Sequence, residues 1–193
     1  MPFESICPSK EHLNILVAFT DKNRYISYEN ELPWKMSLKG DMRFVNKFIR
    51  IEPNTILIVG RRTYESIPKY KDVKVVVVSR KGMEDRSIKS FKSFVEAVEY
   101  ARMQNMFVIV FGGVEIYAEA MKHKHRIFCT IVKEGELKGD RIFPELDTPL
   151  TNISRRVNDF LLENSVPKTW SFKQDENAFE ENGFKYSFFY GES

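Results

Sequence analysis

Short, unbroken runs of apolar residues stand out along the first two thirds of the chain. They are rich in β-branched and aromatic residues and cover positions 13–19, 55–59, 73–78 and 107–111. Unbroken runs, as opposed to alternating ones, are typical of strands that are covered on both faces, as in parallel sheets. The pattern therefore predicts four buried strands of a parallel sheet.

Helical spacing separates these runs. Leu38, Met42, Val45 and Ile49 recur at the intervals that place residues on one face of a helix. Apolar residues at the same spacing predict a second helix over 94–101, and a third covers 114–121, directly after two glycines. Because strands alternate with helices, we expect an α/β fold with right-handed crossovers.

The last third of the chain follows another pattern. Positions 127–132, 169–172 and 184–190 indicate strands with little helix between them. Residues 184–188 alternate between apolar and polar, and Asn182-Gly183 before them is a turn signal. The charged segments 133–140 and 175–182 are typical of solvated surface. We therefore expect one domain over residues 1–193, with a mostly parallel central sheet, an antiparallel C-terminal edge hairpin and flanking helices.

The composition narrows the class of protein. A length of 193 residues suits one domain with a sizeable core. The net charge of +3, from 30 basic and 27 acidic residues, is too balanced to indicate nucleic-acid binding. The first residues lack the regions of a secretory signal, and no apolar run approaches the roughly 20 residues that span a bilayer. We expect a cytoplasmic monomer with no membrane partner.

The cysteines and histidines give no sign of a metal site. Cys7 and Cys129 lie far apart in the sequence, which favours free intracellular thiols. His12, His123 and His125 have no cysteine or carboxylate at ligand spacing, so we expect them on the surface or in loops.

A single acid is the first candidate for chemistry. Asp41 follows the Leu32-Pro33-Trp34 segment and falls on or beside the apolar face of the first predicted helix. One interpretation is structural: an acid in the first helical turn, after Ser37, interacts favourably with the helix dipole. The other is functional: a carboxylate in an apolar pocket needs a positively polarised partner, such as an amidine-like ring.

Glycines and cations follow the predicted strands. Gly60-Arg61-Arg62-Thr63 and Ser79-Arg80-Lys81 come directly after two of them, and Gly112-Gly113 after a third. Strand ends that open helices offer free N–H groups to anions, and the carboxyl edge of an α/β sheet is where ligands bind. The paired glycines are not the GxGxxG fingerprint of an ordinary Rossmann domain. The pattern favours a phosphate-bearing ligand, although each cation by itself is typical of solvated surface.

The order of these motifs resembles dihydrofolate reductase, and the late 184–188 strand is similar to the ending of the eukaryotic-type enzymes. The match runs in order from about residue 13 to the C-terminal strand. It rests on Val17-Ala18-Phe19, Leu32-Pro33-Trp34, Asp41-Met42-Arg43, the run from Gly60 to Pro68, Ser79-Arg80, the run from Phe111 to Tyr117, and Phe143-Pro144.

The resemblance implies a reaction. NADPH would deliver a hydride to C6 of dihydrofolate while N5 gains a proton, and tetrahydrofolate would leave for one-carbon metabolism. Asp41 would bind the 2-amino group and N3 of the pterin, Thr130 would hydrogen-bond in this region, and Trp34 would help to hold a water. Antifolate-like molecules would bind at the same place.

The resemblance also implies two sets of binding residues. For the substrate these are Leu16, Val17, Ala18, Met42, Val45, Ser66, Ile67, Phe111 and Tyr117. For NADPH they are Ala18, Ile26, Gly60, Arg61, Arg62, Thr63, Ser79, Arg80, Lys81, Lys92, Gly112, Gly113, Val114, Glu115 and Ile116. In the family the bond between the paired glycines is cis.

Four departures from the family pattern matter. One extra residue separates Trp34 from Asp41, and Val45 stands where the family usually has phenylalanine. Tyr25-Ile26-Ser27 replaces a Gly-Ile-Gly, which should narrow the backbone choices of the active-site loop. The segment before position 75 is shorter than usual.

The arginine that clamps the folate glutamate is replaced by Val73, with Lys71 and Lys74 nearby. A lysine lacks the fork that pairs with a carboxylate through two hydrogen bonds. We therefore expect weaker binding of the folate tail. Two alternatives remain open: a reductase of another pterin or of a pyrimidine intermediate, and a folate- or nucleotide-binding protein without turnover.

Overall fold

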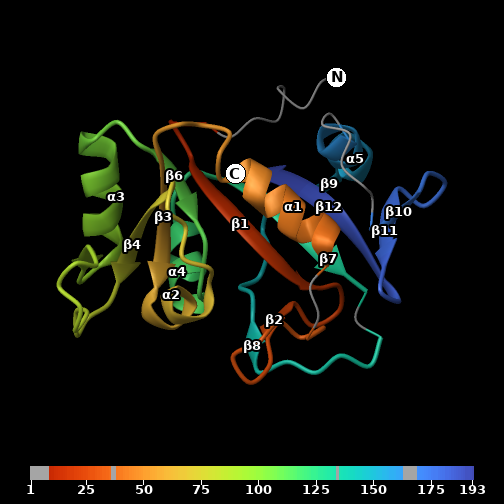
Figure 1. The fold of residues 1–193 in the computed structure, drawn as a ribbon, viewed down its shortest axis with the longest axis horizontal. Coiled ribbons are helices and arrows are strands. Elements are labelled where there is room, and N and C mark those ends of the chain that lie inside the picture. Colours follow the sequence, from red (N-terminus) through yellow and green to blue (C-terminus); the bar gives the residue numbers. More distant parts are fainter. Residues whose placement is uncertain (1–8, 36–37, 134, 163–168) are drawn as a thin grey trace. The chain divides into compact units, whose positions relative to one another are not determined.

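The computed structural model describes residues 9–35, 38–133, 135–162 and 169–193 (Figure 1). The chain folds into two compact units. Among these residues, one unit combines 17–48 with 127–192, and the other combines 9–16 with 49–126 and Ser193. Strand β1 (Leu13–Thr20) contributes its first half to the second of these units and its last half to the first.

The unit built mainly from 49–126 is the parallel part of the fold. Its strands lie in the order β1-β6-β3-β4-β5, and every neighbouring pair is parallel. The strands are β3 (Thr55–Gly60), β4 (Lys74–Val78), β5 (Ser90–Phe91) and β6 (Phe107–Val110). Residues 55–59 and 107–110 are buried throughout. The unbroken apolar runs therefore predicted parallel strands correctly, to within a residue at their ends.

Three helices follow these strands. They are α2 (Arg61–Ser66), α3 (Phe94–Met103) and α4 (Val114–Ala120). The Ser93 side chain caps α3 by accepting a hydrogen bond from the Glu96 N–H, and Phe94, Ala97, Val98 and Ala101 form its buried face. The two later helices confirm the spacing argument.

The other unit carries the antiparallel part. Its strand order is β10-β11-β12-β7-β1, with β9 paired to β12. These strands are β7 (His125–Val132), β9 (Thr151–Asn152), β10 (Ser171–Lys173), β11 (Ala178–Glu181) and β12 (Phe184–Glu192). Asn182 and Gly183, with φ of 52° and 80°, form the two-residue turn between β11 and β12. The edge hairpin and the alternation of β12, with Tyr186 and Phe188 buried, are confirmed.

Two expectations about this unit were wrong. The segment 175–182, expected to be a solvated loop, contains β11, in which Phe179 and Glu181 are buried. A helix, α5 (Ser154–Leu162), lies where little helix was expected. Both elements were missed because their sequences are mostly polar. Glu181, the one buried acid of β11, is hydrogen-bonded, and α5 buries only a narrow stripe around Val157 and Leu161.

The first helix, α1 (Lys39–Phe48), also differs from its expected face. Leu38 and Ile49 are buried as expected, but Met42 and Val45 are half-exposed. The buried face instead consists of Gly40, Asp41, Phe44 and Phe48. Aromatic packing explains the difference, because the Phe44 ring lies 4.9 Å from that of Phe188 and the Phe48 ring 4.6 Å from that of Phe128.

His125 is not the surface residue that we expected. Its side chain is fully buried, and its Nδ1 lies 2.8 Å from the His123 carbonyl oxygen and 3.1 Å from the Ser193 hydroxyl. His125 begins the central strand β7. Its place in the fold buries it, although its neighbours in the sequence are charged. Cys129 is a buried free thiol whose pKa is raised by burial, and Cys7 lies outside the described residues.

Candidate functional site

The carboxyl group of Asp41 is buried at the start of α1. The residue lies in the first helical turn, and only 5% of it is exposed. Its Oδ1 accepts a hydrogen bond of 2.6 Å from the hydroxyl of Thr130 on β7, itself buried. These two candidate residues lie 89 positions apart in the sequence, and the fold joins them.

Burial controls the protonation of this acid. Desolvation raises the pKa of Asp41 from 3.8 to about 6; the hydrogen bond from Thr130 opposes the rise, and the nearby Glu181 carboxylate adds to it. The group therefore changes its charge close to neutral pH, which suits a residue that manages a proton.

Other candidate residues of the same unit lie around the first strand and the helix. Trp34 is buried, and its Nε1 has no hydrogen-bond partner among the described residues. Val17 is buried, whereas Ala18, Met42 and Val45 are partly exposed. Partly exposed apolar side chains on the helix that carries the buried acid, here Met42 and Val45, suit the walls of a ring-binding pocket.

The paired glycines form a tight junction in the other unit. Their peptide bond is cis, as expected, and Gly112 has φ of 118°. A Cβ on Gly112 would lie 3.3 Å from the Thr63 side chain and from the Tyr117 hydroxyl, and one on Gly113 would lie 3.4 Å from Thr63. Side chains would fill this place, so the glycines leave room for a ligand to approach the backbone.

Two helices begin beside this junction without side-chain caps. Gly60 precedes α2 and Gly113 precedes α4, and neither N-terminus receives a capping hydrogen bond from a side chain. The Gly60 N–H donates to the Gly112 carbonyl at 2.7 Å, which ties the ends of β3 and β6 together. First-turn N–H groups that lack a cap are suited to bind phosphate oxygens.

The remaining candidates of this unit gather where its parallel strands end. Most of the predicted phosphate ligands are exposed, namely Arg61, Arg62, Arg80, Lys81 and Lys92, while Ser79 and Thr63 are half-buried. Of the residues from the glycine turn, Ile116 and Tyr117 are buried, and the Tyr117 hydroxyl donates to the Leu16 carbonyl at 3.0 Å. Phe111, Val114 and Ile67 are half-buried, and Glu115 and Ser66 are exposed. The donors present fit a nucleotide with several phosphates.

The comparisons with known proteins identify the family of this chain. The family model of dihydrofolate reductase matches residues 12–166. The chain belongs to the dihydrofolate reductase family. Dihydrofolate reductase of Staphylococcus aureus is 29% identical over 163 residues, which are 82% of this chain and 94% of that protein. The Bacillus subtilis enzyme is 32% identical over 130 residues, 66% of this chain and 73% of the relative.

A solved structure extends the likeness to the whole fold. Dihydrofolate reductase of Schistosoma mansoni superposes with a TM-score of 0.68 at 25% identity, and the match covers 94% of this chain and 97% of that one. Membership of the dihydrofolate reductase family supports an oxidoreductase that converts dihydrofolate to tetrahydrofolate. The resemblance found in the sequence is therefore confirmed.

By the resemblance in sequence, Val73 is the residue expected at the position of the family's glutamate-clamping arginine. It is 8% exposed, and Lys71 and Lys74 close to it are exposed. Asp72 is held by Arg50 through two hydrogen bonds, of 2.5 and 2.9 Å. Neither exposed lysine has the geometry of a two-pronged carboxylate clamp.

The loop without glycine is held by a small sheet. Strand β2 (Tyr25–Ser27) pairs with β8 (Arg141–Ile142). Asp140 accepts hydrogen bonds from the Ser27 hydroxyl at 3.1 Å and the Glu29 N–H at 3.0 Å. Ile26, a predicted cofactor contact, lies half-buried in this loop.

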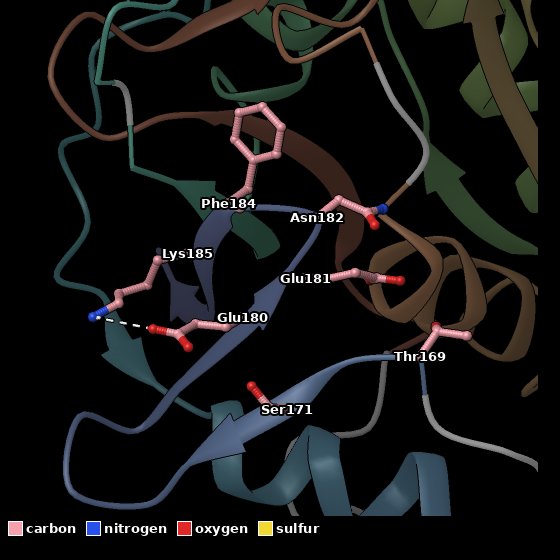
Figure 2. Close-up of a pocket in the computed structure, with 8 residues that line it drawn as sticks. Thr169, Ser171, Glu180, Glu181, Asn182, Phe184 and Lys185 are labelled. Carbon is pink, nitrogen blue, oxygen red and sulfur yellow. Dashed lines mark ion pairs between the residues drawn. The ribbon is translucent and has the colours of Figure 1, made fainter.

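Sequence reasoning missed two residues next to the acid, Glu181 and Tyr186. Both are buried, and the Tyr186 hydroxyl donates to Glu181 Oε2 at 3.1 Å. Figure 2 shows Glu181 directed toward α1, whereas Glu180, the preceding residue, is directed the other way. The one available signal was the alternation around the Asn182-Gly183 turn, which places Glu181 and Tyr186 on the covered face.

Among the described residues, no helix is long and apolar enough to cross a membrane. Within the same residues, no group of three or more histidine, cysteine or acidic side chains could hold a metal ion.

Proposed function

We propose that this chain reduces 7,8-dihydrofolate to 5,6,7,8-tetrahydrofolate with NADPH, by hydride transfer to C6 and protonation of N5. It would act as a cytoplasmic monomer that supplies one-carbon carriers for thymidylate and purine precursors. The observation that supports this most directly is the buried carboxyl of Asp41, bonded to Thr130. A buried carboxylate is stable only with donors, and the 2-amino group and N3 of a pterin offer two.

Asp41 has two tasks in this proposal. Its carboxylate orients the pterin ring, and its negative charge stabilises the proton that N5 receives. Thr130 holds Oδ1 in place, and the unpartnered Nε1 of Trp34 would bind a water beside the acid. The reactive complex carries one added proton, on the acid or on N5. Because the pKa of Asp41 is about 6, the rate of hydride transfer should fall as the pH rises above that value.

NADPH, when bound, supplies the hydride. The glycine pair would let its diphosphate approach the backbone, since a Cβ at either position would occupy that room. Arg61, Arg62 and Thr63 would contact phosphate beside the start of α2. Ser79, Arg80, Lys81 and Lys92 would bind the 2′-phosphate, whose charge distinguishes NADPH from NADH.

The test is the loss of NADPH absorbance when dihydrofolate is added to the purified protein. Turnover that requires both reactants supports the proposal. Tight NADPH binding without turnover on any pterin would instead indicate a binding protein that has lost catalysis.

A second candidate is the reduction of a pterin that lacks the glutamate tail. The observation in its favour is Val73, buried where a tail-binding cation is expected. Dihydrofolate and a dihydropterin without the tail should be titrated in parallel. Values of kcat/KM within about tenfold of each other would favour the tail-less substrate class, because a two-pronged arginine pair contributes more than that.

A further inference from the structure

A buried second acid lies against the start of the helix that carries Asp41. Glu181 is 5% exposed, and its Oε2 accepts a hydrogen bond of 3.0 Å from the Gly40 N–H. The same oxygen accepts the 3.1 Å hydrogen bond from the Tyr186 hydroxyl. The Asp41 carboxylate also interacts electrostatically with the Tyr186 side chain. Two strands of the edge hairpin thus meet at the start of α1.

These contacts supply an acceptor for a backbone N–H group at the start of α1. The first intrahelical hydrogen bond at this end runs from the Met42 N–H to the Leu38 carbonyl. The N–H groups of Gly40 and Asp41 precede it and have no acceptor within the helix. A carboxylate at a helix N-terminus is also favoured by the helix dipole. Glu181 and Tyr186 therefore act as a tertiary cap of α1.

The fit at Gly40 is close. A Cβ at this position would lie 2.3 Å from the Tyr186 hydroxyl and 3.3 Å from the Trp170 ring. Only glycine leaves the Tyr186 hydroxyl in the place from which it bonds to Glu181. The acid, the hydroxyl and the glycine are thus fitted to one another directly beside the candidate catalytic group.

We propose that Glu181 is a positioning residue for the reduction, whose buried carboxylate fixes the first turn of α1, and with it Asp41, through the Gly40 N–H and the Tyr186 hydroxyl. This inference rests on the proposed role of Asp41 in catalysis.

The same carboxylate acts on Asp41 through its charge. Of the ionisable groups on elements packed against β11, Asp41 and Tyr186 interact with it electrostatically. The other charged side chains of these elements are partly or fully exposed: Lys39, Arg43 and Lys47 on α1, Lys173 on β10, Arg155, Arg156 and Asp159 on α5, and Lys185 and Glu192 on β12. A buried like charge therefore makes the ionised state of Asp41 less stable.

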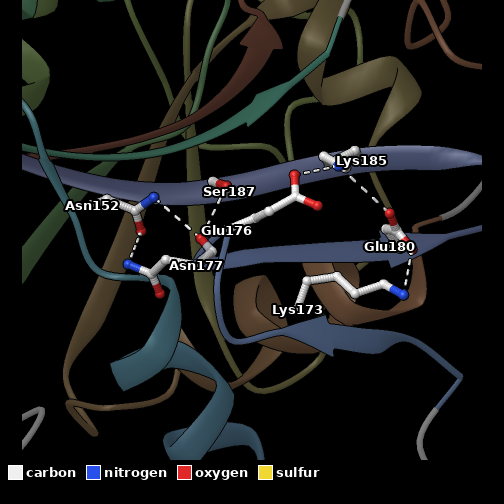
Figure 3. A network of polar contacts seen from close by, with 7 residues as sticks. All are labelled: Asn152, Lys173, Glu176, Asn177, Glu180, Lys185 and Ser187. Carbon is white, nitrogen blue, oxygen red and sulfur yellow. Dashed lines mark hydrogen bonds and ion pairs between the residues drawn. The ribbon is translucent and has the colours of Figure 1, made fainter.

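The experiment compares Glu181→Gln with Glu180→Gln. Glutamine keeps an acceptor for the Gly40 N–H but removes the charge. Glu180 is the matched control, because it lies next to Glu181 on the same strand and forms ion pairs with Lys173 and Lys185 on the other face (Figure 3). We expect the pH midpoint of hydride transfer to move down by about 0.5–1 unit in Glu181→Gln and to stay in place in Glu180→Gln.

Removal of the whole anchor tests positioning. In Glu181→Ala, kcat should fall roughly tenfold or more, as expected when a reacting group is misplaced. Tyr186→Phe removes the hydroxyl alone and should lower kcat in the same direction. Should the alanine variant fail to fold, Glu181→Gln and Tyr186→Phe decide the matter. Wild-type rates and midpoints in these two variants would overturn the proposal.

A readout without turnover separates this proposal from the proposed function. Carbon-13 NMR of aspartate carboxyl groups follows the titration of Asp41 in the free protein. A lower midpoint in Glu181→Gln, with no change in Glu180→Gln, supports the inference even if the wild-type protein does not oxidise NADPH with dihydrofolate. An unchanged Asp41 midpoint contradicts it whatever the activity.

Discussion

Replacement of Asp41 by asparagine should sharply reduce activity and stabilise the protein. Asparagine keeps the shape and can still accept the hydrogen bond from Thr130, but it carries no charge. Without the negative charge that favours protonation of N5, we expect the hydride step at pH 7 to slow by about 10² to 10⁴-fold. Cofactor binding, whose proposed phosphate contacts lie in the other unit, should not change.

The gain in stability follows from the pKa. The carboxyl titrates at 3.8 without burial and at about 6 in the folded protein, so the folded state binds more protons between these values. Stability therefore falls as the pH rises from about 4 to 6 and stays reduced above 6. A pKa shift of this size lowers the free energy of unfolding of the wild-type protein by about 3 kcal/mol at pH 7. The Asp41→Asn variant has no carboxyl to ionise at this position, so it should be more stable than the wild type by up to this amount.

The assays are NADPH oxidation and urea unfolding at several pH values. The stability difference between Asp41→Asn and the wild-type protein should shrink from about 3 kcal/mol at pH 7 to less than about 1 kcal/mol at pH 4. At pH 4 the wild-type carboxyl is protonated in the folded state and about two fifths protonated in the unfolded chain, so little of the difference in free energy remains. A variant that is less stable than the wild type at pH 7, or one that turns over at the wild-type rate, would refute the reasoning.

Three further predictions concern the rest of the two sites. Thr130→Val removes a hydrogen bond that lowers the pKa of Asp41, so the pH midpoint of the hydride step should rise, as a pH–rate profile would show. Gly112→Ala should weaken NADPH binding, measured by fluorescence titration, by more than about tenfold. The control is Gly135→Ala, which also replaces a glycine of positive φ but has no atom within 4 Å of the new methyl group, and which should bind NADPH normally. Arg80→Ala should reduce the preference for NADPH over NADH by about tenfold or more in kcat/KM, and an unchanged preference would place the 2′-phosphate elsewhere.

The parallel half of the fold and the order of the motifs could be predicted from the amino-acid pattern alone. An unbroken apolar run such as 55–59 is removed from water only where both faces of its strand are covered, so its burial follows from its composition alone. The tight turn at the paired glycines after the last of these strands could also be recognised, since few other residues tolerate the φ of 118° that Gly112 has. Asp41 could be placed beside a buried face, but the sequence left a structural role open.

Which polar residues are buried could be seen only in the folded chain. His125 and Glu181 look like surface residues in their charged surroundings, yet both are buried, because distant parts of the chain supply their hydrogen bonds. The same holds for the face of α1, where contacts with Phe188 and Phe128 select Phe44 and Phe48 over Met42 and Val45. Local patterns record what a segment prefers, whereas the burial of a polar group depends on partners that only the folded chain brings to it.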